Sequence, residues 1–292
     1  MFSSIFCLFT VIYMFFLFYF LLFILGTAIG SFLGVVVDRI AGKESIWRGR
    51  SHCDHCRHNL YVLDLIPIVS FFLLGRKCRY CHKKLSWFYP LIEFCTAVVY
   101  LAAGYFIFQS SGFLLSQLHY QLLALYYFLL TGALIAIFFT DLRYGIIPFK
   151  VVVFAFLITV IWDFLLPVLH FSQLEIQLLG LQTNALSILA SAIGAGGFFF
   201  LLFLVTKGRG MGFGDVVYAF LMGITLGFPR VLLGLYIAFV TGAVISLLLV
   251  VMKKKKLKGG TIPFGPFLVL GTIISLLWGN VLINYIIRYL TH

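Results

Sequence analysis

The run that decides the fold class is IFCLFTVIYMFFLFYFLLFILGTAIGSFLGVVV, residues 5–37. It contains no charged residue, and it is longer than the roughly 20 residues that an α-helix needs to cross a bilayer. A cleavable signal peptide would begin with basic residues and would have a shorter apolar core. We therefore expect residues 1–37 to remain in the protein as its first membrane span.

The composition of the whole chain points the same way. Hydrophobic residues make up 63% of it and charged residues 10%, whereas a soluble domain carries roughly 25% charged residues. A transmembrane β-barrel would show short alternating segments instead of long apolar runs. The sequence predicts an all-α polytopic membrane protein with about eight transmembrane helices. The expected spans are 5–37, 88–108, 119–140, 149–168, 184–206, 213–228, 231–252 and 264–290.

The distribution of basic residues predicts the orientation. With the N-terminus outside, 19 of the 21 Lys and Arg residues fall on one side of the membrane, and the positive-inside rule makes that side the cytoplasm. Segments 38–87 and 253–258 would both lie there. The net charge of +12 then reflects topology and contact with anionic lipid, so we expect membrane lipid as a partner and no nucleic acid.

Residues 38–87 form the one sizeable polar segment, between the first and second predicted spans. It carries two CxxC pairs, CDHC and CRYC, whose spacing is typical of a tetrahedral four-thiolate zinc site. A metal would compensate for the small core that about fifty residues can bury. Reversible disulfides or free thiols are the alternative, and nearby histidines could replace a cysteine. The expected ligands of a structural Zn²⁺ are Cys53, Cys56, Cys78 and Cys81.

Two carboxylates are predicted at the cytoplasmic ends of different spans: Asp141 in FFTDLRYGIIPFK and Asp215 in KGRGMGFGDVVYAF. At one depth they could share a site, where one carboxyl group stays protonated and the other ionised. Such a pair can activate a water and protonate a leaving amine. Gly212 and Gly214 would let irregular backbone approach a peptide beside a wetted cavity. The alternative is two interfacial aspartates that are solvated or cap helices.

Together these motifs resemble the prepilin peptidases, also called type IV leader peptidases, which are bifunctional membrane enzymes. The resemblance covers most of the chain in order. GMGFGD is similar to the GxGD motif that the family shares with presenilin-like intramembrane proteases. The matching stretches are GSFLGVVVDR (30–39), SHCDHC (51–56), LDLIPIVSFFLLGRKCRYC (63–81), LSWFYPLIEF (85–94), DLRYGIIP (141–148), GMGFGD (210–215) and IPFGPFLVLG (262–271).

The resemblance implies that Asp141 and Asp215 are a catalytic pair that removes the leader peptide of type IV prepilins or pseudopilins. Cleavage would occur at the cytoplasmic face of the bacterial cytoplasmic membrane. A second activity, in some members of the family, methylates the new N-terminal residue, usually Phe, with S-adenosylmethionine. It is associated with the zinc domain and its neighbours, here including Glu93. The family usually has Asn at the position of Gly34 and Lys at that of Val217.

The expected domains are the first span (1–37), the zinc-binding, methyltransferase-associated insert (38–87) and a seven-span aspartic peptidase domain (88–292). Two other classes share part of this pattern. A proton-coupled transporter could use paired intramembrane aspartates, but it leaves the four cysteines and the GxGD motif unexplained. A zinc-bearing membrane scaffold without catalysis is the other alternative, and it would tolerate replacement of either aspartate.

Overall fold

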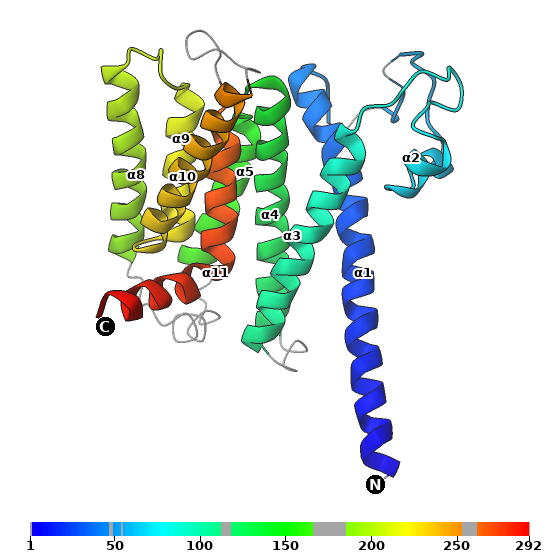
Figure 1. Ribbon diagram of the computed structural model, residues 1–292, viewed down its shortest axis with the longest axis horizontal. Helices are drawn as coiled ribbons and strands as arrows, with labels where there is room; N and C mark the ends of the chain where they lie inside the picture. Colours follow the sequence, from blue (N-terminus) through cyan, green and yellow to red (C-terminus); the bar gives the residue numbers. More distant parts are fainter. Residues whose placement is uncertain are drawn as a thin grey trace. The chain divides into compact units, whose positions relative to one another are not determined.

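The computed structural model describes residues 2–46, 49–53, 55–111, 118–165, 185–252 and 262–291. Within these residues the chain forms helices and two isolated β-bridges, so the all-α prediction is confirmed for the described part. The chain divides into two compact units, Met1–Ser116 and Gln117–His292. Figure 1 shows the helices of each unit.

The first unit is built on a pair of long helices, α1 (Phe2–Ala41) and α3 (Phe88–Ser111), which pack against each other. Their backbones touch where α1 carries glycine. A Cβ atom added at Gly26 would lie 2.6 Å from the Cα of Ala97, and one at Gly30 would lie 2.6 Å from the Cα of Glu93. Small residues spaced four apart thus give α1 a smooth face for close helix packing, as their spacing predicts.

The insert between α1 and α3 contains a 3-10 turn, η1 (Val62–Leu65), and the short helix α2 (Val69–Leu73). Polar contacts join the first residues of the insert to the long helices. Arg39, in the last turn of α1, is buried and donates hydrogen bonds to the carbonyl oxygens of Ile46 and Gly49, both at 3.0 Å. The hydroxyl of Tyr89 on α3 donates to Asp38 at 2.9 Å. The insert therefore starts from a fixed position on the α1–α3 pair.

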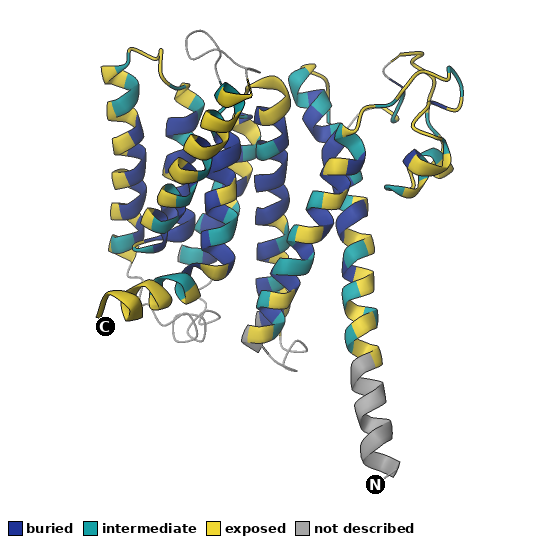
Figure 2. Ribbon diagram, viewed as in Figure 1, coloured by how far each residue is buried: buried dark blue, intermediate teal, exposed yellow. Residues whose placement is uncertain are grey.

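The second unit is a helical bundle with α9 at its centre. The helix α9 is buried on most sides, and it contacts α5, α8, α10 and α11 (Figure 2). A π-helical turn, Ile161–Leu165, continues α5. The helices of the unit are α4 (Leu118–Tyr144), α5 (Phe149–Val160), α8 (Ala185–Val205), α9 (Phe213–Leu226), α10 (Arg230–Val251) and α11 (Gly265–Thr291).

Two contacts hold α9 in place. A Cβ atom added at Gly223 would lie 2.5 Å from the Cα of Ala192, so α9 and α8 meet backbone to backbone. The buried hydroxyl of Tyr218 donates to Thr272 Oγ1 on α11 at 2.9 Å, which satisfies both polar groups inside an apolar bundle. Because α9 is fixed along its length, its first turn is also held in a defined position.

Six helices of the described part are long and apolar enough to cross a membrane. The predicted spans 149–168 and 213–228 coincide with α5 and α9, which are shorter. Helix α9 has 14 residues, about 21 Å of rise, against roughly 30 Å of bilayer hydrocarbon. The count of eight crossings is therefore not confirmed, although the described part of the chain contains a helix at each predicted span. The basic run 253–258 lies outside the described residues.

Candidate functional site

The first predicted carboxylate, Asp141, lies in the last turn of α4 with 5% of its surface exposed. The first residue of α11 covers it. A Cβ atom added at Gly265 would lie 2.5 Å from Asp141 Oδ2 and 3.0 Å from its Cγ. The start of α11, in the IPFGP stretch, thus brings backbone into contact with the carboxyl group, and glycine is the residue that leaves room for this contact.

The second carboxylate, Asp215, is buried in the first turn of α9. Its Oδ2 accepts the N–H of Gly212, the N-cap residue, at 3.0 Å. This contact satisfies one of the backbone donors left unpaired at a helix start. The helix-capping alternative for Asp215 is therefore correct for one carboxylate oxygen.

The elements that carry the two carboxylates meet in the second unit. The turn that follows α4 packs against the start of α9, where a Cβ atom added at Gly214 would lie 3.0 Å from Ile147 Cβ. The carboxyl groups of Asp141 and Asp215 interact electrostatically. Gly212 and Gly214 lie within three residues of Asp215, and the catalytic pairing of the two aspartates stays a prediction.

One oxygen of this pair is buried and unpaired. Asp141 Oδ2 has no hydrogen-bond partner within the described residues. A buried polar atom left in this state costs about 1–3 kcal/mol unless water or a ligand completes it. An unpaired carboxylate oxygen such as Asp141 Oδ2 can accept a hydrogen bond from a water molecule.

The four cysteines of the insert converge as predicted. Their sulfur atoms all lie within 4.8 Å of one another, and Cys53 Sγ and Cys81 Sγ are 3.9 Å apart. A tetrahedral zinc site with bonds near 2.3 Å has sulfur–sulfur edges of about 3.8 Å, so the cluster fits Zn²⁺. All four would bind the ion and leave no open position, as in structural zinc sites.

Both CxxC turns have the same backbone design. In each, the N–H of the first cysteine, Cys53 or Cys78, donates to the carbonyl five residues later, at 3.0 and 2.9 Å. The residue after the second cysteine, Arg57 or His82, has a positive φ of 57° or 56°. Burial raises the pKa of the Cys78 thiol, but hydrogen bonds from backbone N–H groups and the neighbouring thiols outweigh it and lower the pKa to about 7. This environment favours the thiolate that binds zinc.

Replacing Cys53 and Cys78 by Ser is expected to remove the metal from the full-length protein. The wild-type chain should carry about one zinc ion, because four thiolates complete one tetrahedral site. Metal analysis after reducing, zinc-replete purification measures both proteins, with Cys95→Ser on α3 as the control that keeps its zinc. Wild-type protein without zinc would contradict the assignment.

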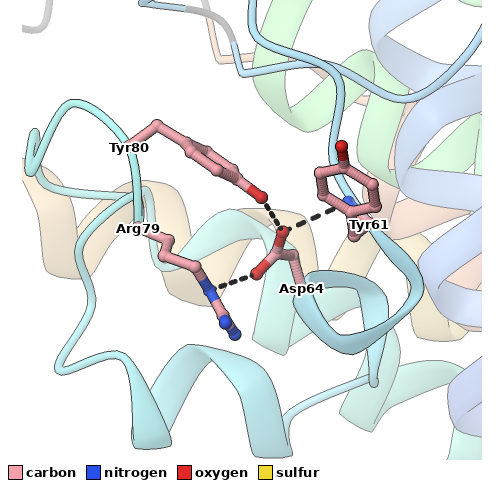
Figure 3. Close-up of polar contacts among 4 residues, drawn as sticks. All are labelled: Tyr61, Asp64, Arg79 and Tyr80. Atoms are coloured by element: carbon pink, nitrogen blue, oxygen red, sulfur yellow. Dashed lines mark hydrogen bonds and ion pairs between the residues drawn. The ribbon is translucent and has the colours of Figure 1, made fainter.

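Sequence patterns did not identify Asp64, which organises the rest of the insert. Its buried carboxylate accepts the Tyr61 N–H at 3.1 Å and the Tyr80 hydroxyl at 3.0 Å, and it forms an ion pair with Arg79 Nε at 2.8 Å (Figure 3). Arg79 and Tyr80 are the two central residues of CRYC. Asp64 therefore joins η1 to the second CxxC turn, and only the three-dimensional structure reveals this role.

Asp64→Ala is expected to destabilise the zinc-loaded insert by about 2–4 kcal/mol, since it leaves the Tyr80 hydroxyl and the Tyr61 N–H without their acceptor. Arg79→Gln is the matched control. Arg79 is about half exposed, so its loss should cost less than about 1 kcal/mol. The urea dependence of zinc release to a chromogenic chelator measures both. Equal midpoints for the two variants would show that the carboxylate is not the organising group.

Glu93, the remaining predicted site residue, lies in the first unit on α3 and is buried. Its Oε2 accepts the N–H of Ile68 at 2.7 Å. Ile68 has a positive φ of 60° and is the N-cap of α2. The carboxylate of Glu93 thus holds the start of α2 against α3.

Two family models match the chain in the order that the motifs suggest. The one described as the bacterial peptidase A24 N-terminal domain matches residues 24–107, and the type IV leader peptidase family matches residues 128–247. The first match includes the four cysteines and Glu93, and the second includes Asp141 and Asp215. No solved structure matches the chain.

Curated relatives similar to this chain carry the name prepilin leader peptidase/N-methyltransferase. The protein of Stutzerimonas stutzeri is 29% identical over 281 residues, which cover 88% of this chain and 89% of the relative. That of Aeromonas hydrophila is 28% identical over 300 residues, covering 94% and 95%. That of Bacillus subtilis (strain 168) is 28% identical over 270 residues, covering 92% and 97%. The similarity therefore extends over nearly the whole length of each protein.

Proposed function

We propose that this chain, which belongs to the type IV leader peptidase family, cleaves the leader peptide of type IV prepilins or pseudopilins. Its family makes it a peptidase of the prepilin-processing type. In this proposal Asp141 and Asp215 are its catalytic pair. It is a multi-pass membrane protein with apolar spans on both sides of its insert. Cleavage takes place at the cytoplasmic face of the bacterial inner membrane, the side to which the positive-inside rule assigns the insert.

The observation that carries this proposal is the buried carboxylate pair in the second unit. One carboxylate removes a proton from a water, which then attacks the scissile carbonyl carbon. The protonated partner supports the carbonyl oxygen and afterwards a proton passes to the leaving amine, so both acidic groups are needed. Asp215 keeps one oxygen on the Gly212 N–H, which fixes its orientation during the reaction.

The non-helical stretch before α9 gives the substrate access to this pair. Gly212 is exposed and Gly214 partly exposed, and both lie within three residues of Asp215. A peptide strand could lie along this backbone with few side chains in its way. The shortness of α9 also supports a site near the membrane surface, because a helix of 14 residues does not reach across the hydrocarbon.

We further propose that the chain methylates the new N-terminal residue, as the name of its relatives indicates for them. The methyl donor would be S-adenosylmethionine. In this proposal Zn²⁺ stabilises the insert and takes no part in the chemistry. Glu93 contributes by holding α2 in place through Ile68, so it positions the insert that carries the activity.

Purified protein incubated with a candidate prepilin tests the peptidase proposal. We expect one new peptide bond cleavage, at the junction of leader and mature sequence, detected by mass spectrometry of both products. A proton-coupled transporter or a zinc-bearing scaffold would leave the prepilin at full length. Intact prepilin after prolonged incubation with folded, zinc-loaded enzyme would therefore favour those alternatives.

A further inference from the structure

The insert carries an apolar surface that the zinc site does not use. It comprises six side chains of η1 and α2 and the residues near them, here called the insert patch: Val62, Leu63, Ile66, Val69, Phe72 and Leu73. Val62 and Leu73 are each 81% exposed, and the other four are 39–64% exposed. Figure 2 shows α2 coloured largely as exposed. The two short elements η1 and α2 contact each other, and exposed large apolar side chains on neighbouring elements mark a surface that meets a partner or a membrane.

The insert patch is attached to α3 near the beginning of its apolar span. The N–H of Ile68, directly before α2, donates to Glu93 Oε2 at 2.7 Å. Glu93 is five residues into α3, whose apolar span begins at Phe88, so this contact lies about 8 Å along the span. Amphipathic segments at a bilayer surface bury their apolar side chains about 5–10 Å into the boundary between headgroups and acyl chains.

The surroundings of the patch have the composition of such an interface. Trp87 precedes α3, and its ring lies 5.2 Å from that of Phe71 and 6.0 Å from that of Phe72. The guanidinium group of Arg76 stacks over Trp87 at 4.6 Å. Interfacial tryptophans occur where a chain enters the bilayer, and basic groups above them attract anionic headgroups. Over residues 38–87 there are ten Lys and Arg residues against four Asp and Glu residues.

The patch is also held in a fixed orientation. Asp64 ties η1 to the second CxxC turn through Arg79 and Tyr80, and Glu93 ties the start of α2 to α3. A segment fixed at both points cannot turn its apolar side chains toward the small core of the insert. Their exposure is thus a property of the folded insert, and a partner is needed to remove this surface from water.

We propose that the insert patch is embedded in the membrane leaflet on the side of the insert, with anionic lipid as its partner. The zinc-bearing insert is then anchored to the bilayer at a third point besides α1 and α3. This inference does not depend on the peptidase activity, because it rests on the depth of Ile68, the exposed apolar side chains and the neighbouring cations.

Tryptophan quenching by brominated lipid tests the proposal. Leu73→Trp and Val62→Trp are made in the full-length chain, and each is reconstituted into vesicles of phosphatidylcholine and phosphatidylglycerol, with or without bromine at acyl carbons 6 and 7. Lys83→Trp, at an exposed charged position of the same insert, is the matched control. For each variant, the tryptophan fluorescence in excess of that of the parent protein is compared between vesicles with and without brominated lipid. The zinc content of each variant confirms that its insert is folded.

We expect the added fluorescence of Leu73→Trp and Val62→Trp to be mostly lost in brominated vesicles and that of Lys83→Trp to be mostly retained. Retained fluorescence at both patch positions would overturn the proposal. If it is retained in vesicles but shifts to the blue when a prepilin peptide is added, the patch is a peptide-binding surface and the lipid assignment is wrong. Equal loss in all three variants would also contradict it, because the insert would then be immersed without a preferred face.

Discussion

Asp141→Asn and Asp215→Asn are each expected to lower the rate of prepilin cleavage by about a thousandfold or more. Removing a group that transfers protons in the transition state costs a factor of roughly 10²–10⁴, and the effects of a pair that acts together are not additive. Asparagine has nearly the same size but neither accepts a proton nor donates one as an acid. The double variant should therefore be little slower than either single variant.

The control for these variants is Asp163→Asn. Asp163 lies in the π-helical turn Ile161–Leu165, about 21 Å along the helix from Phe149, which follows the turn beside the carboxylate pair. We expect the Asp163→Asn variant to cleave prepilin at the wild-type rate. Cleavage is followed by mass spectrometry of the products, and zinc content and membrane insertion should match the wild type. Near wild-type cleavage by either dyad variant would exclude the aspartic mechanism.

Gly265→Ala is expected to reduce cleavage by about a hundredfold, although only one methyl group is added. That methyl would lie 2.5 Å from Asp141 Oδ2, so the carboxyl group or the start of α11 must move. Displacement of a catalytic group by about 1 Å can cost a factor of roughly 10². The initial rate of prepilin cleavage at saturating substrate measures this loss.

Gly197→Ala on α8 is the matched control, because a Cβ atom there meets no other atom within 4 Å. Its activity should be unchanged, and its stability unchanged or slightly higher, since alanine is a better helix former than glycine. Thermal unfolding of both variants separates loss of the fold from misplacement of Asp141. Full activity in Gly265→Ala would mean that the contact between α11 and Asp141 does not position the carboxylate.

The parts of the site that the sequence predicts are those with a local signature. Two CxxC pairs specify a zinc cluster because the turn chemistry lies within each motif, and the four sulfur atoms do converge. Asp141 and Asp215 are conspicuous because carboxylates are rare in apolar runs. The contact of Gly265 with Asp141 has no such signature, since it joins residues more than a hundred positions apart.

The length of the helices was harder to predict than their number. Hydropathy places an apolar run at 213–228, whereas α9 begins at Phe213, after its N-cap Gly212, and ends at Leu226, before Gly227 with its positive φ of 62°. Hydropathy also gives no indication that the insert lies against α3. That position depends on the positive φ of Ile68 and on the reach of the Glu93 carboxylate, which are properties of the folded insert.

The central claim, that this chain removes prepilin leaders with the Asp141–Asp215 pair, is tested most directly by co-expression with the pilin-like proteins of the same genome. The N-terminus of each pilin-like protein is then sequenced. We predict a shortened N-terminus with the wild-type chain and the full leader with Asp215→Asn, at equal levels of the membrane protein. Full-length leaders on all of these proteins beside the wild-type chain, or shortened ones beside Asp215→Asn, would contradict the account.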